Sequence, residues 1–354
     1  MAADTKKVRV GVIGVGIGRV HLEGYKKLGD AVEIVGICDL KEDRGQQAAK
    51  DFGAKNFVTD YKELLAMPEI DLVDVCVPNY LHAEMAVAGL QAGKHILCEK
   101  PMANTLENAQ KIVAAANKSE KLFMMGMNNR FRGDTQVLKK MITDGQLGDI
   151  YYAKCGWVRR NGIPGFGGWF TTKAESGGGP LIDIGVHLLD VTMYLMGNPV
   201  PVSASGATYA KFGPRGRGMG SHGLDSDLNA ASKYDVEDLA TALVKFENGA
   251  TLFIEASWAS YIAREQLYST LLGTEGGADL DPLRVYKDLS GAPVDITPQF
   301  PRVGGHEAEI KHFIECIQQG KQPIATAEQG LHVLQILDAV YRSAQSGKEV
   351  IIER

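Results

Sequence analysis

The 354-residue sequence has no long hydrophobic run, no paired cysteines and no surplus of basic residues. Nowhere do about 18 apolar residues follow one another, as a membrane-spanning helix requires. Residues Met1–Lys7 are polar and lead into a strand-like segment rather than into the apolar stretch of a signal peptide. Lysine and arginine total 38 against 43 acidic residues, and the net charge of −5 disfavours nucleic acid and membrane surfaces as partners. We therefore expect a cytoplasmic protein that binds no nucleic acid and no membrane.

Cysteine is scarce, and its placement argues against a metal centre. The five cysteines are odd in number and widely spaced, and most lie inside apolar strand-like runs. This arrangement gives neither a disulfide framework nor a CxxC metal pattern. A zinc-dependent dehydrogenase needs a cluster of cysteine and histidine ligands, and no such spacing joins the five cysteines to the eight histidines. We expect reduced core cysteines and no metal.

Glycine is the residue in excess, at 41 positions, and its clusters indicate where function is to be sought. The length of the chain favours two domains. The first 127 residues alternate apolar strand-like runs, such as Val8–Ile13 and Leu72–Val77, with helical segments such as Thr105–Ser119. Strands that are apolar throughout, at this spacing, are typical of a parallel sheet covered by helices on both faces. We predict a doubly wound α/β domain over residues 1–127.

The pattern changes after Asn128. Long strand-like stretches with few crossovers follow, among them Tyr151–Arg159 and Ala250–Ser257, and Asn248-Gly249 is a strong hairpin signal. Two helical segments close the chain. We predict that residues 128–354 form an α+β domain built on an open, mostly antiparallel sheet.

The first glycine cluster follows the first predicted strand and leads straight into a helix. Gly14, Gly16 and Gly18 alternate there with other residues, a pattern typical of a turn that presents backbone amides and a helix N-terminus to a pyrophosphate. Arg19 occupies the position of the usual third glycine, so we expect a phosphate turn one residue tighter than usual. We expect this turn, including Ile17 and Arg19, to contact a dinucleotide.

Asp39, at the end of the second predicted strand, bears on the choice of dinucleotide. A carboxylate at this place accepts hydrogen bonds from both hydroxyls of the adenosine ribose and repels a 2′-phosphate, which favours NAD over NADP. In the alternative interpretation Asp39 only begins a turn, and Lys41 or Arg44 neutralises a phosphate. Pro78-Asn79 follows another predicted strand, at the edge where open parallel sheets bind ligands, and is a second candidate for cofactor contact.

Four motifs together resemble the Gfo/Idh/MocA family, the group of glucose-fructose oxidoreductase and inositol dehydrogenase. They are the glycine turn followed by His21, Pro78-Asn79 with His82, Glu99-Lys100-Pro101 after the fifth predicted strand, and Asp183-x-Gly185-x-His187. The resemblance spans nearly the whole chain and implies an N-terminal Rossmann domain and a C-terminal domain that binds substrate and forms a homodimer or homotetramer. It further implies hydride transfer between a nicotinamide and a sugar-like secondary alcohol, and it adds His82, Glu99 and Lys100 to the expected cofactor contacts. We expect His21 to serve packing or a helix-start contact.

Oxidation of a secondary alcohol needs a base and a positive group that stabilises the alkoxide as it forms. A helical segment after the run Gly177–Gly179 places Asp183 and His187 one turn apart. We predict His187 as the general base, because imidazole titrates near neutrality, with Asp183 orienting it or binding substrate. Lys100 follows a strand at the cofactor edge, where its ammonium can bond the reacting oxygen and relay the proton. The catalytic lysine, aspartate and histidine of the family fall on these three residues.

A structural interpretation of the same three residues is open. In it Lys100 pairs with Glu99 and Asp183 caps the helix. His187 is then a buried histidine with satisfied hydrogen bonds.

Aromatic and arginine side chains in a second glycine-rich stretch suit a carbohydrate. Trp157, Arg159 and Trp169 lie there, and aromatic rings pack on the apolar faces of sugars while arginine donates to hydroxyls. The alternative is a connector packed at a subunit contact. Asn128 and Arg130 follow the sixth predicted strand, at the domain junction, and can reach either ligand. The expected substrate contacts are Lys100, Asn128, Arg130, Trp157, Arg159, Trp169, Asp183 and His187.

Three functional hypotheses follow. The first is an NAD-dependent dehydrogenase that oxidises a secondary hydroxyl of an inositol, a free sugar or a glycoside, for example at C3. The second is a glycosidase that uses the same oxidation to acidify a neighbouring C–H bond and expel the aglycone, with NAD recycled. The third is a non-catalytic NAD sensor or scaffold. The intact set of Lys100, Asp183 and His187 favours an enzyme.

Overall fold

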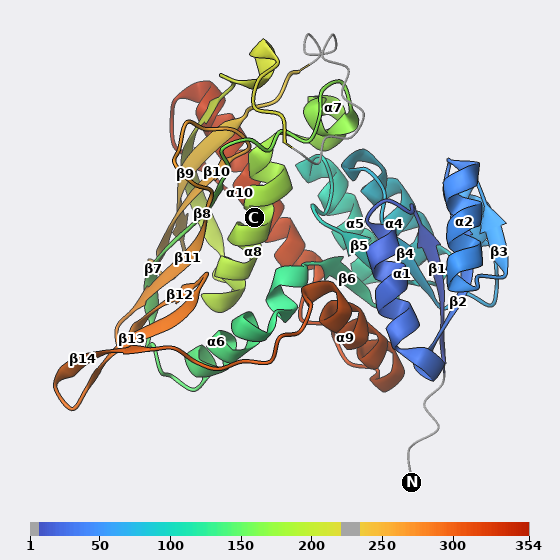
Figure 1. Ribbon diagram of the computed structural model, residues 1–354, viewed down its shortest axis with the longest axis horizontal. Helices are drawn as coiled ribbons and strands as arrows, with labels where there is room; N and C mark the ends of the chain where they lie inside the picture. Colours follow the sequence, from blue (N-terminus) through green and yellow to red (C-terminus); the bar gives the residue numbers. More distant parts are fainter. Residues whose placement is uncertain (1–6, 221–233, 354) are drawn as a thin grey trace. The chain divides into compact units, whose positions relative to one another are not determined.

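The computed structural model describes residues 7–220 and 234–353 (Figure 1). The polar stretch Met1–Lys7 therefore lies, apart from its last residue, outside the described part of the chain. Contacts divide the chain into unit 1, residues 1–131 and 303–331, and unit 2, residues 132–302 and 332–354. Residues 303–331 thus belong to unit 1, whereas the predicted division after residue 127 assigns them to the second domain. The division into separate domains at that residue stays a prediction.

Unit 1 is built on a six-stranded parallel sheet in the order β3-β2-β1-β4-β5-β6. This is the strand order of the doubly wound dinucleotide-binding fold. Its strands are short apolar runs, and all residues of β4 are buried because helices cover both faces of the sheet. The predicted α/β fold of this region is therefore confirmed. The strands are β1 (Val8–Ile13), β2 (Val32–Cys38), β3 (Asn56–Val58), β4 (Leu72–Val75), β5 (His95–Glu99) and β6 (Phe123–Gly126).

The helices of unit 1 begin and end where the sequence supplies caps. Thr105 precedes α5, and its hydroxyl accepts the Asn108 N–H at 3.2 Å. Gly53 and Gly320 end α2 and α9 in the left-handed conformation. Helix α1 contacts α2 and α9, and α4 contacts α3 and α5. The helices are α1 (Gly18–Lys27), α2 (Glu42–Phe52), α3 (Tyr61–Leu65), α4 (His82–Gln91), α5 (Leu106–Lys118) and α9 (Gly305–Gln319).

Unit 2 is built on a nine-stranded sheet in the order β14-β13-β12-β11-β7-β10-β9-β8-β15. Its pairs are antiparallel except for β7 with β10, so the predicted mostly antiparallel sheet is confirmed. Asn248-Gly249 forms the predicted turn between β9 and β10, with Gly249 at φ +83°. The strands are β7 (Ile150–Val158), β8 (Pro201–Tyr209), β9 (Leu239–Phe246), β10 (Thr251–Ser257), β11 (Gln266–Gly273), β12 (Gly277–Leu280), β13 (Leu283–Leu289), β14 (Ala292–Ile296) and β15 (Val350–Ile351).

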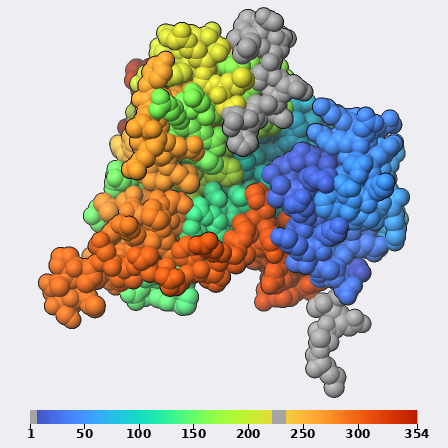
Figure 2. All heavy atoms as spheres, viewed as in Figure 1, coloured from blue at the N-terminus to red at the C-terminus, as the bar shows by residue number. Residues whose placement is uncertain are grey.

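The two faces of this sheet differ. On the inner face Ile254 and Leu271 are fully buried, and α8 packs against β7 and β11. On the outer face Leu243 and Leu272 are 40% and 38% exposed. The hairpin of β13 and β14, in orange, stands out from the rest of unit 2 (Figure 2), and most of β14 is exposed. The helices of unit 2 are α6 (Gly133–Thr143), α7 (Lys173–Ser176), α8 (Val186–Leu195) and the part of α10 (Ala327–Ser346) that follows Leu331.

Among the described residues, no helix combines the length and the hydropathy that a membrane span needs.

His95, the first residue of β5, is expected to make the stability of the protein depend on pH. Its Nδ1 accepts the Leu122 N–H at 3.0 Å, and burial, with the nearby charge of Lys121, lowers its pKa from 6.5 to about 4. The unfolded chain therefore takes up this proton at a higher pH than the folded chain. The stabilising contribution is complete above pH 6.5 and is lost as the pH falls toward 4.

His95→Asn keeps an acceptor at this position but cannot be protonated. Urea unfolding between about pH 7.5 and about pH 4.5 should show a shallower loss of stability in the variant than in the wild type. Parallel pH profiles of the two proteins would contradict the assignment.

Candidate active site

The glycine turn lies between β1 and α1, at the carboxyl edge of the sheet. Gly14 has φ +90°, and a Cβ atom there would lie 2.3 Å from the Cys76 carbonyl oxygen, so only glycine fits. A Cβ at Gly16 would meet no atom within 4 Å, which shows that this part of the turn faces open space. Exposed backbone at a helix N-terminus is the arrangement that binds a pyrophosphate. The turn therefore fits the phosphates of a dinucleotide.

Gly18 takes over the packing role of the third glycine that the sequence lacks. A Cβ there would lie 3.1 Å from Cys76 Cβ and 3.2 Å from a methyl group of Val12, so its absence lets α1 approach the sheet closely. Arg19, at the usual glycine position, extends away from the sheet and pairs with Asp51 of α2 at 2.8 Å. The substitution by arginine is thus accommodated by a neighbouring glycine. The predicted contact of Arg19 with the cofactor stays a prediction.

Asp39, directly after β2, holds the glycine turn as well as the edge of the sheet. The carboxylate is buried, and it accepts the Val15 N–H and the Lys41 N–H, both at 2.8 Å. The Arg44 guanidinium binds both of its oxygens, at 2.7 and 2.9 Å. Features of both interpretations are therefore present, since Asp39 begins a turn and pairs with Arg44, yet also sits at the position of the ribose-binding carboxylate.

His82 links the loops that follow β4 and β5. Its ring nitrogens lie 2.8 Å from the Val77 carbonyl and 2.7 Å from the Pro101 carbonyl, and the side chain is fully buried. Burial lowers its pKa. Pro78-Asn79 lies within one of these loops and Lys100 within the other. His82 therefore fixes two segments that the sequence assigns to cofactor binding.

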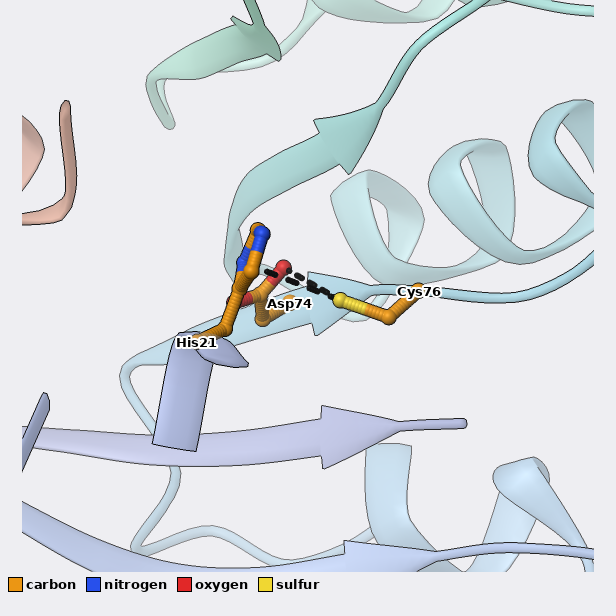
Figure 3. A group of neighbouring side chains, drawn as sticks. All are labelled: His21, Asp74 and Cys76. Carbon is orange, nitrogen blue, oxygen red and sulfur yellow. Dashed lines mark hydrogen bonds and ion pairs between the residues drawn. The ribbon is translucent and has the colours of Figure 1, made fainter. Parts of the chain in front are cut away.

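A cluster of buried ionisable side chains is formed by residues of α1, β4 and β5. Figure 3 shows three of its members, His21, Asp74 and Cys76. His21 Nδ1 is 2.8 Å from Asp74, and its Nε2 is 3.0 Å from Glu99. Tyr25 donates to Asp74 at 2.9 Å, and the Cys76 thiol donates to the same carboxylate at 3.3 Å. His21 was expected to serve packing. It is instead the centre of a charged network.

The charges of this cluster follow from its contacts. Burial is the largest single influence on the His21 pKa and lowers it, but the charge and hydrogen bond of Asp74, together with the neighbouring Cys76, raise that pKa well above its usual value. Burial is the largest single influence on the Glu99 pKa and raises it, but the hydrogen bond and charge of His21, together with the charges of Lys100 and His306, lower the pKa to about 2. Burial raises the Cys76 pKa, so the thiol stays neutral. The raised pKa of His21 and the lowered pKa of Glu99 both favour an ion pair between these two side chains.

Asn128 and Arg130 lie in the turn after β6. The Arg130 side chain is 1% exposed, and its guanidinium donates to the Ile324 carbonyl at 2.7 Å and to the Gln329 side chain. Asn128 Nδ2 lies 3.4 Å from His306 Nδ1. Arg130 thus has structural partners within unit 1. The predicted substrate contacts of the two residues stay predictions.

Asp183 and His187 lie on consecutive turns of one helical segment of unit 2. Residues Leu181–Gly185 form a π-helical turn that continues into α8. Asp183 Oδ2 accepts the indole N–H of the buried Trp258 at 3.0 Å, which fixes its orientation. The ring centroid of His187 lies 6.4 Å from that of Trp157. Asp183 and His187 are therefore brought together, whereas Lys100 belongs to unit 1, and its approach to them stays a prediction.

A buried carboxylate anchors the start of this helical segment. Glu237 accepts the Gly179 N–H at 2.9 Å, the Leu181 N–H at 3.2 Å and the Tyr341 hydroxyl at 2.9 Å. A Cβ at Gly179 would lie 2.1 Å from the Glu237 carbonyl oxygen, which explains one glycine of the run. The sequence interpretation missed this anchor and missed Trp258. The available signal was the acidic stretch Asp235–Asp238, which contains Glu237 and directly precedes the apolar strand β9.

Trp157 and Arg159 form a partly exposed wall at the end of β7. The Arg159 guanidinium lies 4.2 Å from the Trp157 ring centroid, and Glu265 accepts the Trp157 indole N–H at 2.6 Å. Trp169 stacks on Phe170 with centroids 3.7 Å apart. Aromatic and guanidinium groups placed in this way suit the faces and hydroxyls of a sugar ring.

The site residues and the fold define a class of protein. An open glycine turn at the edge of a 3-2-1-4-5-6 sheet marks unit 1 as a dinucleotide-binding domain, and unit 2 adds a histidine and a carboxylate suited to proton transfer. The class is a dinucleotide-dependent oxidoreductase.

The chain belongs to the Gfo/Idh/MocA oxidoreductase family. The model of the family's NAD-binding Rossmann domain matches residues 8–127, and the model of its C-terminal α/β domain matches residues 139–352. The resemblance drawn from the four motifs is confirmed, and so is NAD as the cofactor.

Relatives and solved structures agree with this membership. The chain is 35% identical to D-glucoside 3-dehydrogenase of Escherichia coli (strain K12), over 99% of each chain. It is 27% identical to scyllo-inositol 2-dehydrogenase (NAD(+)) of Bacillus subtilis (strain 168), over 98% of this chain and 97% of the relative. A solved levoglucosan dehydrogenase in complex with NADH and levoglucosan is similar with a TM-score of 0.84 at 25% identity, covering 99% of this chain and all of that chain.

Asp39 is expected to set the preference for NAD over NADP. Asp39→Ser removes the carboxylate that repels a 2′-phosphate and releases the Arg44 guanidinium to bind one. The ratio of kcat/KM for NAD to that for NADP should fall about 10-fold or more, as expected for the loss of a charge-assisted hydrogen bond. Asp43→Ser, an equal change of charge on the exposed first turn of α2, is the matched control. An equal fall in both variants would show a general charge effect only.

Proposed function

We propose that the chain is an NAD-dependent dehydrogenase that oxidises a secondary hydroxyl of a glycoside, for example at C3 of a glucoside. Free sugars and inositols are the neighbouring substrate classes. The observation that carries the proposal is the wall of Trp157 and Arg159, which lies beside His187. His187 belongs to the helical segment that also bears Asp183. The relative named D-glucoside 3-dehydrogenase, matched from end to end, supports the same substrate class.

The roles of the residues follow from their chemistry. When bound, NAD supplies the acceptor for the hydride. His187 removes the hydroxyl proton, because a neutral imidazole accepts a proton and is the side chain most often used as a general base. Asp183, oriented by the indole of Trp258, binds the substrate or orients the histidine. Lys100 donates a hydrogen bond to the reacting oxygen and stabilises the alkoxide as it forms.

The test of the proposed activity is NADH formation at about 340 nm with a panel of inositols, free aldoses and glucosides, with aglycone release followed in parallel. NADH formation with glucosides supports the proposal, and NADH formation with another class alone moves the substrate to that class. Aglycone release without net NADH would replace it by the redox-assisted glycosidase. NAD binding with neither product would leave the sensor or scaffold. A homodimeric or homotetrameric state and a cytoplasmic location stay predictions.

Lys100→Ala and His187→Ala should each lower kcat by about 10²-fold or more, because each removes a group that moves or stabilises a proton in the transition state. The affinity for NADH, measured by fluorescence, should change little in His187→Ala. Lys111→Ala, on the exposed face of α5, is the control for loss of a lysine charge. Unchanged turnover in both active-site variants would refute the assigned roles.

A further inference from the structure

The charged cluster beneath the cofactor edge has no explanation in the proposed activity alone. The side chains of His21 and Asp74 are fully buried and that of Glu99 is 7% exposed, so three ionisable groups lie in the core of a parallel sheet. Buried ion triads contribute little net stability, and apolar residues of similar volume often replace them without loss. A core strand such as β4 is otherwise apolar. The cluster is therefore costly for the fold, and its contacts point to another role.

The contact distances within the cluster are those of hydrogen bonds, shorter than the spacing of two ligand atoms on a tetrahedral zinc ion. Two ligand atoms bound tetrahedrally to zinc at about 2.0–2.3 Å lie roughly 3.3 Å or more from each other. The His21 Nδ1 to Asp74 distance is 2.8 Å and the His21 Nε2 to Glu99 distance is 3.0 Å. These are hydrogen-bond lengths, and each ring nitrogen donates a proton to one carboxylate.

The hydrogen bonds form a continuous chain that ends at a predicted catalytic residue. Asp74 binds one side of the His21 ring, and the other side binds Glu99 Oε1. Glu99 Oε2 in turn accepts the backbone N–H of Lys100 at 3.0 Å. A carboxylate whose two oxygens bind different partners has a fixed rotation. The ring of His21 thereby sets the position of the peptide that carries Lys100.

We infer that His21 is a positioning residue, which holds Lys100 at the carboxyl end of β5 through the buried carboxylate of Glu99. The inference rests on the proposed function of Lys100. Helix α1 then has a second role besides presenting the glycine turn, because its residue His21 fixes Lys100, which directly follows β5. Tyr25 also binds Asp74, at 2.9 Å, but has no hydrogen bond to Glu99.

Two replacements of His21 separate its hydrogen bond to Asp74 from its hydrogen bond to Glu99. The amide nitrogen of asparagine corresponds to Nδ1 of histidine and that of glutamine to Nε2. His21→Asn therefore keeps the bond to Asp74 and loses the bond to Glu99, whereas His21→Gln keeps the bond to Glu99. Both variants lose the same charge and the same ring.

His21→Asn should lower kcat by about 10- to 100-fold, because small misplacements of a catalytic group have effects of this size. His21→Gln should retain most of the activity that His21→Asn loses. Tyr25→Phe, which removes a hydrogen bond to Asp74 of nearly the same length, should keep the wild-type kcat. NADH affinity and the melting temperature are measured for all three, and the two histidine variants should melt at similar temperatures.

Two outcomes would overturn the inference and leave a structural role only. One is an equal kcat in His21→Asn and His21→Gln. The other is a loss of kcat that follows the melting temperature through all three variants. If His21→Asn does not fold, Glu99→Ala replaces it, and a wild-type kcat in that variant would equally overturn the inference. Lys100→Ala is measured alongside. Unchanged turnover in Lys100→Ala shows that the proposed function of Lys100 fails, whereas a loss there without a loss in His21→Asn shows that only the role of His21 fails.

Discussion

The close approach of α1 to the carboxyl ends of β1 and β4 is the constraint on which the cofactor edge depends. Gly14 and Gly18 permit it, because any side chain at either position would collide with or crowd Cys76 after β4. The approach opens the backbone of the turn toward solvent at Gly16. It also brings His21, one turn further along α1, within hydrogen-bond distance of Asp74 on β4. The phosphate turn and the buried charge network thus have one geometric cause.

Buried carboxylates that accept backbone N–H groups are a shared device of both units. Asp39 holds Val15 in the glycine turn, and Glu99 holds the peptide of Lys100. In unit 2, Glu237 holds the start of the helical segment that carries the predicted base, and Asp238 accepts three consecutive N–H groups of the loop from Lys211 to Gly213. In each case the segment lacks a partner in a regular ladder or helix, and a charge-assisted hydrogen bond replaces it.

The features that could be predicted from the sequence are those that depend on residues close together along the chain. Apolar runs alternating with helical segments, the glycine turn and Asn248-Gly249 gave both sheet types, and four motifs gave the family and NAD. The sequence did not reveal β12–β14, because these short strands pair only with one another and with β11, and most of β14 is exposed. Nor did it reveal the partners of His21 or of Asp183, since Asp74, Glu99 and Trp258 lie far from them along the chain and meet them only in the fold.

The wall of Trp157 and Arg159 is held, with Glu265, by contacts among partly exposed side chains. Asp183, by contrast, is bound to a buried indole, and the start of its helical segment to a buried carboxylate. Exchange of a wall residue therefore disturbs few neighbours, whereas exchange of an anchor disturbs the core. Under the proposed function, selection can for this reason alter the range of sugars accepted while the machinery of hydride transfer is retained, so divergence of specificity requires few compensating mutations.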